Sequence, residues 1–295
     1  MVRFKKILCP VDFFPASERA LAYALKLAAK DGARLKLLHV VSLMVPPGYD
    51  FVADSDSLLA KMEDSSQRQI RQLLQKRSLS GQNVDVEVEV KRGDPSTEIR
   101  NALDTYKPDL VAMGTHGHRG FQRWIMGSTT ERVLHHSRVP MLVISAAEKH
   151  RSTDVTFRRI MVTTDFSQDT AHALKYAFSI AGENQALLTV LHVLEEMKAI
   201  TSAQYRKQLT RDVQRKLSKL VPDDVKDWCE VEAAVEAGSP YHAILMTLKK
   251  RRIDLLVMNT HGKGMLDRAL LGSTTERVVK GATCPVLLIP PRRKS

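Results

Sequence analysis

The chain has 295 residues, of which 43% are hydrophobic and 26% charged, a composition typical of globular proteins. No apolar run approaches the roughly 18 residues that suggest a membrane span, and three cysteines without CxxC spacing argue against a disulfide framework and favour a reducing cytoplasm. The net charge of +12 and a pI near 9.7 favour anionic partners.

Nucleic acid is one candidate partner. Against it, basic residues are spread along both halves with acidic residues between them, aromatic residues make up only 5%, and no recognition motif is present. Nucleotides, acidic proteins and anionic lipid surfaces would account for the charge equally well. The sequence therefore argues against nucleic acid and leaves any protein partner unknown.

The first half alternates predicted strands and helices. A helix is predicted over residues 17–30, where apolar residues recur with helical spacing and Gly32 follows the end. A second helix over 61–78 has a basic, solvated face, and Asp94-Pro95 predicts the start of a third. The predicted strands are residues 7–11, 35–41, 84–90, 110–113 and 141–145.

The second half repeats this plan after a polar linker over residues 148–154. Its predicted strands are residues 159–163, 187–194, 229–235, 255–258 and 286–289. Alternation of mostly hydrophobic strands with helices predicts parallel sheets covered by helices on both faces. The strand over 84–90 alternates valine with acidic residues, so it is predicted to lie at a sheet edge.

The halves are two copies of one domain. Asp12-Phe13 recurs as Asp165-Phe166, and the segment 114–130 recurs as 259–275, whereas the second copy is shorter between its second and third strands. This period is too long for a solenoid repeat and predicts two domains, residues 1–147 and 157–291.

The repeated segment predicts an anion site. In an open parallel sheet, ligands bind beyond the carboxyl ends of the strands, where Asp12 and Gly114 would meet. Glycines there let backbone N–H groups approach an anion, and a helix beginning at Gly127-Ser128-Thr129 would attract phosphate at its N-terminus. Asp12 would accept hydrogen bonds from adenine or ribose. The alternative is purely structural, with the glycines serving a turn and the hydroxyls a helix cap.

These residues resemble the universal stress protein (UspA-like) superfamily in its tandem form. Gly114, Gly117, Gly127 and Ser128 match the Gly-x2-Gly-x9-Gly-Ser/Thr pattern of its ATP-binding members, and Pro10-Val11-Asp12 is similar to the family's first-strand segment. The resemblance implies two open-twisted, five-stranded parallel sheets of order 3-2-1-4-5 flanked by helices, the adenine nucleotide alpha hydrolase-like fold. It also implies that the last strands of the two domains pair, and a further homodimer is compatible with it.

The expected ligand is ATP, or ADP or AMP, with Mg²⁺ as its possible companion. In the second copy Asn259 replaces the first glycine and Thr163 replaces Pro10; asparagine tolerates a left-handed backbone, yet its side chain would crowd a phosphate. The candidate nucleotide-binding residues are Pro10, Asp12, Val40, Met113, Gly114, His116, Gly117, Gly127, Ser128 and Thr129 in the first copy, and Asp165, Val193, Met258, Asn259, His261, Gly262, Gly272, Ser273 and Thr274 in the second.

The expected role is a nucleotide-responsive stress or signalling module, in which nucleotide orders the loop between Gly117 and Gly127. The P-loop lysine that grips transferable phosphates is missing, which argues against rapid hydrolysis. No catalytic and no metal-ligating residue is predicted, since the histidines have no regular ligand spacing. A slow ATPase or autokinase acting through Ser128, and a nucleotide-independent scaffold for protein or lipid, stay open as alternatives.

Overall fold

The computed structural model describes residues 2–42, 55–76, 84–115, 126–148, 156–195, 202–262 and 271–291. Contacts within the chain divide these residues into two compact units. The first unit contains residues 4–42, 55–76, 84–115 and 126–139, and the second unit contains residues 2–3 and all described residues from 140 onward. The domain boundaries predicted from the sequence stay a prediction.

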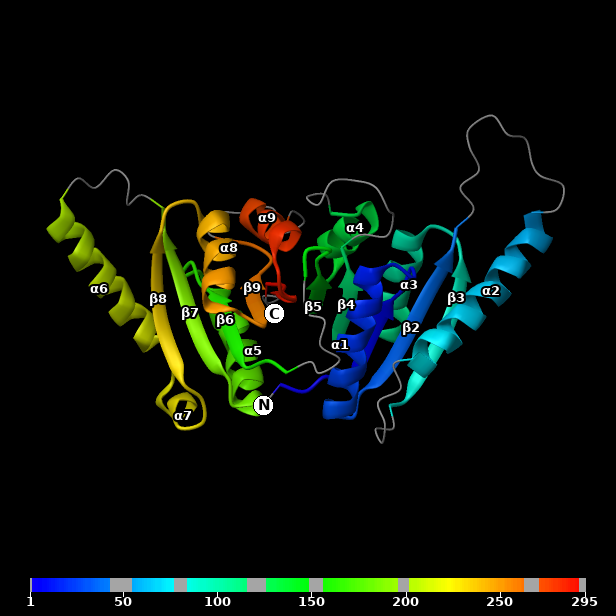
Figure 1. The fold of residues 1–295 in the computed structure, drawn as a ribbon, viewed down its shortest axis with the longest axis horizontal. Helices are drawn as coiled ribbons and strands as arrows, with labels where there is room; N and C mark the ends of the chain where they lie inside the picture. Colours follow the sequence, from blue (N-terminus) through cyan, green and yellow to red (C-terminus); the bar gives the residue numbers. More distant parts are fainter. Residues whose placement is uncertain are drawn as a thin grey trace, which may run out of the picture. The chain divides into compact units, whose positions relative to one another are not determined.

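The first unit is a parallel sheet of order β3-β2-β1-β4 covered by helices on both faces (Figure 1). Helices α3 and α4 contact each other on one face, while α1 packs against β1 and β4. The strands are β1 (Lys6–Pro10), β2 (Arg34–Val41), β3 (Val86–Arg92) and β4 (Leu110–Gly114). The helices are α1 (Pro15–Asp31), α2 (Ser55–Lys76), α3 (Pro95–Tyr106) and α4 (Ser128–His136).

The second unit repeats this plan, with the strand order β8-β7-β6-β9-β10 that the family resemblance implies. Helix α5 packs against β6 and β9, and α6 packs against β8 (Figure 1). The strands are β6 (Arg159–Thr163), β7 (Leu187–Leu194), β8 (Val231–Ala237), β9 (Leu255–Asn259) and β10 (Val286–Ile289). The helices are α5 (Thr170–Asn184), α6 (Ala203–Lys219), α7 (Asp223–Lys226), α8 (Pro240–Arg251) and α9 (Ser273–Gly281).

Strand β5 (Met141–Ile144) belongs to the second unit, although it comes from the first copy of the repeat. It pairs antiparallel with β10, Leu142 opposite Leu287, so this sheet is mixed rather than wholly parallel. All four residues of each strand are buried, and pairing satisfies backbone groups that an open sheet edge would leave bare. The expected pairing of the last strands is therefore confirmed.

Every predicted strand is present, with ends shifted by at most two residues. Strand β3 begins at Val86 rather than Val84 because its pairing with β2 starts at Leu35. It lies at the edge of its sheet, as its alternating charge predicts. The helix predicted over 61–78 begins earlier, at Ser55, and residues 77 and 78 lie outside the described residues.

The core lies along the central strands of each unit. Ile7, Leu8 and Val111 in the first unit, and Ile160 and Val257 in the second, have no exposed surface. Such continuous apolar strands are expected where helices cover both faces of a parallel sheet. None of the helices in the described part of the chain combines the length and the apolar character needed to cross a membrane.

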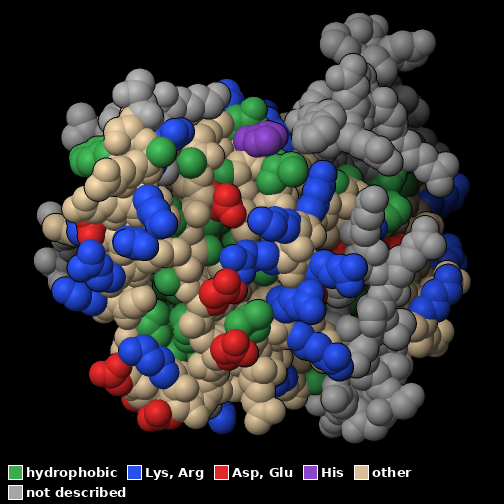
Figure 2. Space-filling model, turned by 60° about the vertical axis from the view of Figure 1, so that its left-hand side comes forward, with side chains coloured by type: hydrophobic (Ala, Val, Ile, Leu, Met, Phe, Trp, Pro, Cys, Tyr) green, Lys and Arg blue, Asp and Glu red, His purple; other side chains and the backbone are tan. Residues whose placement is uncertain are grey.

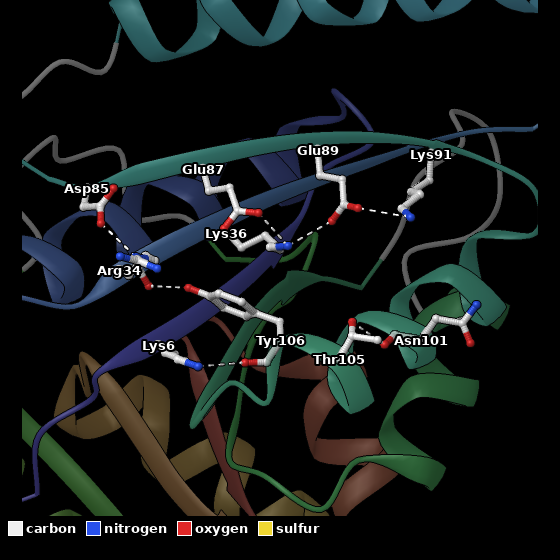
Figure 3. A network of polar contacts seen from close by, with 10 residues as sticks. All are labelled: Lys6, Arg34, Lys36, Asp85, Glu87, Glu89, Lys91, Asn101, Thr105 and Tyr106. Carbon is white, nitrogen blue, oxygen red and sulfur yellow. Dashed lines mark hydrogen bonds and ion pairs between the residues drawn. The ribbon is translucent and has the colours of Figure 1, made fainter.

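A polar network joins β2, β3 and α3 at the edge of the first unit (Figure 3). Lys36 lies between two carboxylates of β3, with Nζ 2.7 Å from Glu87 and 3.1 Å from Glu89, and its side chain is only 13% exposed. Burial lowers the pKa of Lys36, but the hydrogen bonds to the two glutamates outweigh it and raise the pKa overall. The ammonium group also lies 5.0 Å from the ring centroid of Tyr106.

We expect Lys36→Met to lower the free energy of unfolding by about 2 kcal/mol, because it leaves the partly buried carboxylate of Glu89 and the exposed carboxylate of Glu87 without their shared cation. Since the pKa of Lys36 is raised on folding, its contribution is present at neutral pH and is lost only as the pH rises above about 10.5. The matched control is Lys91→Met, because Lys91 is 47% exposed and its ammonium group lies 3.1 Å from Glu89, so a change below about 0.5 kcal/mol is expected. Urea unfolding followed by circular dichroism measures both, and equal losses would contradict a special role for Lys36.

Candidate functional site

The candidate site of the second unit is a cavity of about 860 Å³ at the carboxyl ends of β6 and β9. These strands are neighbours, so Asp165, which follows β6, and Asn259, which ends β9, reach the same opening. All nine candidate residues of the second copy line this cavity: Asp165, Val193, Met258, Asn259, His261, Gly262, Gly272, Ser273 and Thr274.

Helix α9 begins at the cavity wall with an uncapped N-terminus. Its N-cap is Gly272, which supplies no side-chain hydrogen bond, and the first intrahelical bond runs from the N–H of Glu276 to the Gly272 carbonyl at 2.9 Å. The N–H groups of Ser273 and Thr274 have no hydrogen-bond partner in the described part of the chain. Free N–H groups at a helix start favour an anion.

The hydroxyl of Thr275 ties α9 to the end of β9 by donating to the Asn259 carbonyl at 3.1 Å. In the first unit, the hydroxyl of Thr130 donates to the Gly114 carbonyl at 2.8 Å. Both threonines are buried. Sequence reasoning missed this role, although the repeated Gly-Ser-Thr-Thr motif was the available signal.

Asp165 is held by the turn that follows it. Its Oδ1 accepts hydrogen bonds from the N–H of Ser167 at 2.9 Å and from the hydroxyl of Thr170 at 3.3 Å. Phe166 has a φ of 59°, in the left-handed region that residues with a Cβ rarely adopt. This strained backbone is the kind found where a side chain must be aimed at a ligand.

His192 lies beside this turn and lines the same cavity. Its Nδ1 is 2.8 Å from the Thr164 carbonyl, which only accepts, so Nδ1 carries the proton. Its ring centroid is 4.6 Å from that of Phe166. His192 is therefore a partly buried histidine whose Nδ1 is satisfied and whose ring supports the turn.

The first unit has the same turn. Oδ1 of Asp12 accepts from the N–H of Phe14 at 3.0 Å and from the hydroxyl of Ser17 at 2.5 Å. Phe13 has a φ of 63°, and its ring centroid lies 4.5 Å from that of His39. Burial lowers the pKa of His39, which therefore stays neutral at neutral pH.

The structure describes most of the other candidate residues of the first copy. Pro10 ends β1, Val40 lies near the end of β2, and Met113 is buried in β4. Gly127 is the N-cap of α4, again without a side-chain hydrogen bond, and Ser128 and Thr129 form the first turn of that helix. His116, Gly117 and the loop predicted to become ordered lie outside the described residues.

Packing requires a glycine at position 114, a role that was not predicted from the sequence. A Cβ at this position would lie 2.7 Å from the backbone carbon of Ala16 and 2.7 Å from the backbone nitrogen of Ser17, in the first turn of α1. The second copy holds Asn259 at the matching position, and α5 begins later in the repeat than α1 does. The glycine therefore lets α1 approach β4, whatever it does for an anion.

Asn259 fits into the second copy and leaves its Oδ1 buried, with no hydrogen-bond partner among the described residues. An unsatisfied buried acceptor costs about 1–3 kcal/mol. Because Asn259 lines the cavity, a donor on a bound ligand would satisfy this oxygen. Replacement of the motif's first glycine thus supplies a polar group instead of merely filling space.

Several cavity residues were not among the candidates predicted from the sequence. Tyr205 and Leu209 come from α6, and Pro240 and Ile244 come from α8. The α6 residues lie in the part of the second copy that is shorter than the first, so no repeat landmark marks them. Only the packing of these helices beside β7 and β8 brings them to the cavity.

Comparison with known proteins identifies the family. A model described as the universal stress protein family matches the chain twice, over residues 3–145 and 156–290. A universal stress protein of Mycolicibacterium smegmatis is 25% identical over 298 residues, with 97% of each chain covered. One from Methanocaldococcus jannaschii is 31% identical over 150 residues, which are 49% of this chain and 88% of the relative.

Among solved structures, a universal stress protein from Archaeoglobus fulgidus matches with a TM-score of 0.70. The match covers 98% of this chain and 97% of that one at 23% identity, and it shows the common fold. Since the two family matches together span most of the chain, in register with the two halves of the repeat, the protein belongs to the universal stress protein family as a tandem member.

Proposed function

We propose that this protein binds an adenine nucleotide, ATP or its di- or monophosphate, in the second-unit cavity and in the matching crevice of the first unit. Binding would make it a nucleotide-responsive stress or signalling module. One observation carries the proposal: the uncapped start of α9 and the fixed carboxylate of Asp165 line one cavity of about 860 Å³. Cavities of about 300–1,000 Å³ are typical of small-molecule sites.

The two kinds of polar group suit the two ends of a nucleotide. The free N–H groups of Ser273 and Thr274 would receive phosphate oxygens, since a helix N-terminus carries partial positive charge. Asp165 and the Oδ1 of Asn259 are acceptors, and they would receive ribose hydroxyl or adenine amino groups. Mg²⁺ enters the proposal only as the companion of the phosphates.

The surface charge supports an anionic ligand in a general way. On the face seen in Figure 2, Lys and Arg side chains are spread over the surface with fewer Asp and Glu side chains between them. Such a field raises the local concentration of anions without selecting one. The selection would come from the cavity itself.

We also propose a cytoplasmic location. Cys9, Cys229 and Cys284 are buried and form no disulfide. Burial raises the pKa of each thiol, so all three stay protonated and unreactive. Free thiols of this kind suit a reducing compartment.

Calorimetric titration of Mg-ATP into nucleotide-stripped protein tests the proposal. The expected result is saturable heat with two nucleotides bound per chain. One nucleotide per chain would confine binding to a single unit. No heat, together with no shift of the thermal unfolding midpoint at millimolar Mg-ATP, would contradict nucleotide binding and favour a scaffold for protein or lipid.

A further inference from the structure

The second unit has another cavity, of about 690 Å³, beside the turn that holds Asp165. The nucleotide cavity is lined by Thr164 and Asp165, and this second cavity is lined by the residues that follow directly, Phe166 and Ser167. Its other walls come from α5 and from the segment around α7. All residues that line it belong to the same compact unit.

Aromatic and aliphatic side chains form most of its walls, namely Phe166, Leu174, Phe178, Val225 and Trp228. Trp228 is 39% exposed, which leaves apolar surface for a ligand to cover.

The position of Trp228 depends on Gly182 of α5. A Cβ at Gly182 would lie 2.0 Å from the indole, so only glycine lets the ring pack against the helix backbone. Gly182 therefore determines the shape of this cavity wall.

One polar group on the wall lacks a partner. The Oγ of Ser167 is buried and has no hydrogen-bond partner among the described residues. The other serine of the wall, Ser179, already accepts from the N–H of Val2 and donates to Glu183. The first copy has Phe14 where the second has Ser167, so this hydroxyl distinguishes the second unit.

The charges at the cavity balance. Lys175 and Asp224 both line it, and both are exposed. One cation and one anion favour neither an acidic nor a basic ligand, whereas apolar walls with a single buried hydroxyl favour a neutral one.

We propose that this cavity is a second ligand site, for a small neutral aromatic molecule with one hydroxyl or carbonyl group. The rings would pack between Phe178 and Trp228. The polar group of the ligand would pair with the Ser167 hydroxyl, which is otherwise left unsatisfied.

The site is connected to the nucleotide cavity through the shared turn. Ser167 and Thr170 line the second cavity, and both also donate to Oδ1 of Asp165, Ser167 through its backbone N–H and Thr170 through its hydroxyl. A ligand that pulls on Ser167 would therefore change the orientation of the Asp165 carboxylate. This connection, unlike the ligand site itself, rests on the proposed nucleotide binding.

Fluorescence of Trp228 tests the ligand site, with 2-naphthol as the probe. A Trp124→Phe background leaves Trp228 as the only tryptophan of the chain. We expect saturable quenching with a dissociation constant of about 0.1 mM, a value in the range for a ligand of this size. The absence of saturation below about 1 mM would overturn the proposal.

Two variants locate the probe. Ala171 is exposed and lines the cavity, so Ala171→Phe should fill it and abolish quenching without disturbing the core. The matched control is Ala203→Phe on α6, an exposed alanine that lines neither cavity, and it should leave the titration unchanged. Undiminished binding to folded Ala171→Phe protein would overturn the assignment.

Ser167→Ala tests the hydrogen bond. It should weaken 2-naphthol about fivefold to tenfold and leave naphthalene, which has no hydroxyl, unchanged. Equal effects on the two probes would overturn the role of Ser167.

Repeating the 2-naphthol titration with saturating Mg-ATP tests the connection between the cavities. A shifted dissociation constant is expected, with the same factor appearing in the nucleotide affinity when the order is reversed. If calorimetry detects nucleotide but the constant does not shift, the connection is overturned. If calorimetry detects none, the nucleotide proposal has failed separately, and the naphthol titration alone decides on the ligand site.

Discussion

Gly114→Ala is expected to lower the free energy of unfolding of the first unit by about 3 kcal/mol. The new Cβ would lie 2.7 Å from backbone atoms of Ala16 and Ser17, and backbone in the first turn of a helix cannot rotate away as a side chain can. Helix α1 would have to move from β4, against which it packs. Since the hydroxyl of Ser17 holds Asp12, the same shift should weaken nucleotide binding in the first unit.

The matched control for Gly114→Ala is Asn259→Ala, at the equivalent position of the second copy. A Cβ is already present there, and the change removes a buried acceptor without a partner, so a change in stability within about 1 kcal/mol is expected. Hydrogen exchange of peptides from β1, α1 and β4 reports on the first unit alone. Unchanged exchange in Gly114→Ala protein would show that α1 does not require the glycine.

Gly272→Val should reduce the nucleotide affinity of the second-unit cavity at least about 100-fold, which corresponds to about 2.8 kcal/mol. The backbone of Gly272 has a φ of −60° and a ψ of 136°, which valine adopts without strain, so the fold should survive. The added isopropyl group would lie on the cavity wall beside the free N–H groups of α9 and keep phosphate oxygens from them.

Thr274→Val is the control for Gly272→Val. Valine has nearly the same shape as threonine, and the substitution removes only one hydroxyl from the cavity wall. An affinity loss of less than about tenfold is therefore expected. Calorimetry should show two nucleotides per chain for Thr274→Val and one for Gly272→Val. Two sites of unchanged affinity in Gly272→Val protein would place the phosphates away from α9.

The local pattern of the sequence was sufficient to predict the helices and strands and, for most strands, which strands lie beside them. Apolar runs predict most of the ten strands, because a strand buried on both faces must be hydrophobic along its length. The alternating charge of residues 84–90 places β3 at an edge. Helix ends were predicted less well, since α2 begins at Ser55, six residues before the predicted start.

The candidate residues of the second-unit cavity at the ends of β6 and β9 were found from the repeat, because two copies in register show which glycines, aspartates and hydroxyls recur. Their roles were not visible in the same way. The repeat shows Gly114 and Asn259 as a mismatch, whereas the structure shows that α1 excludes a Cβ and that α5, which begins later, accepts one. The difference depends on how closely the first turn of each helix, α1 or α5, approaches the end of a strand that lies far away in the chain.

By itself, the sequence determined the duplication, the α/β architecture, the family and nine of the residues that line the second-unit cavity, because each of these is carried by local spacing and composition. Only the tertiary structure decided the contribution of Tyr205 and Leu209 to the second-unit cavity and the presence of the apolar cavity beside Ser167. These features depend on packing between segments that are far apart in the chain and are not related by the repeat. The segments come together only when the helices pack on the sheets.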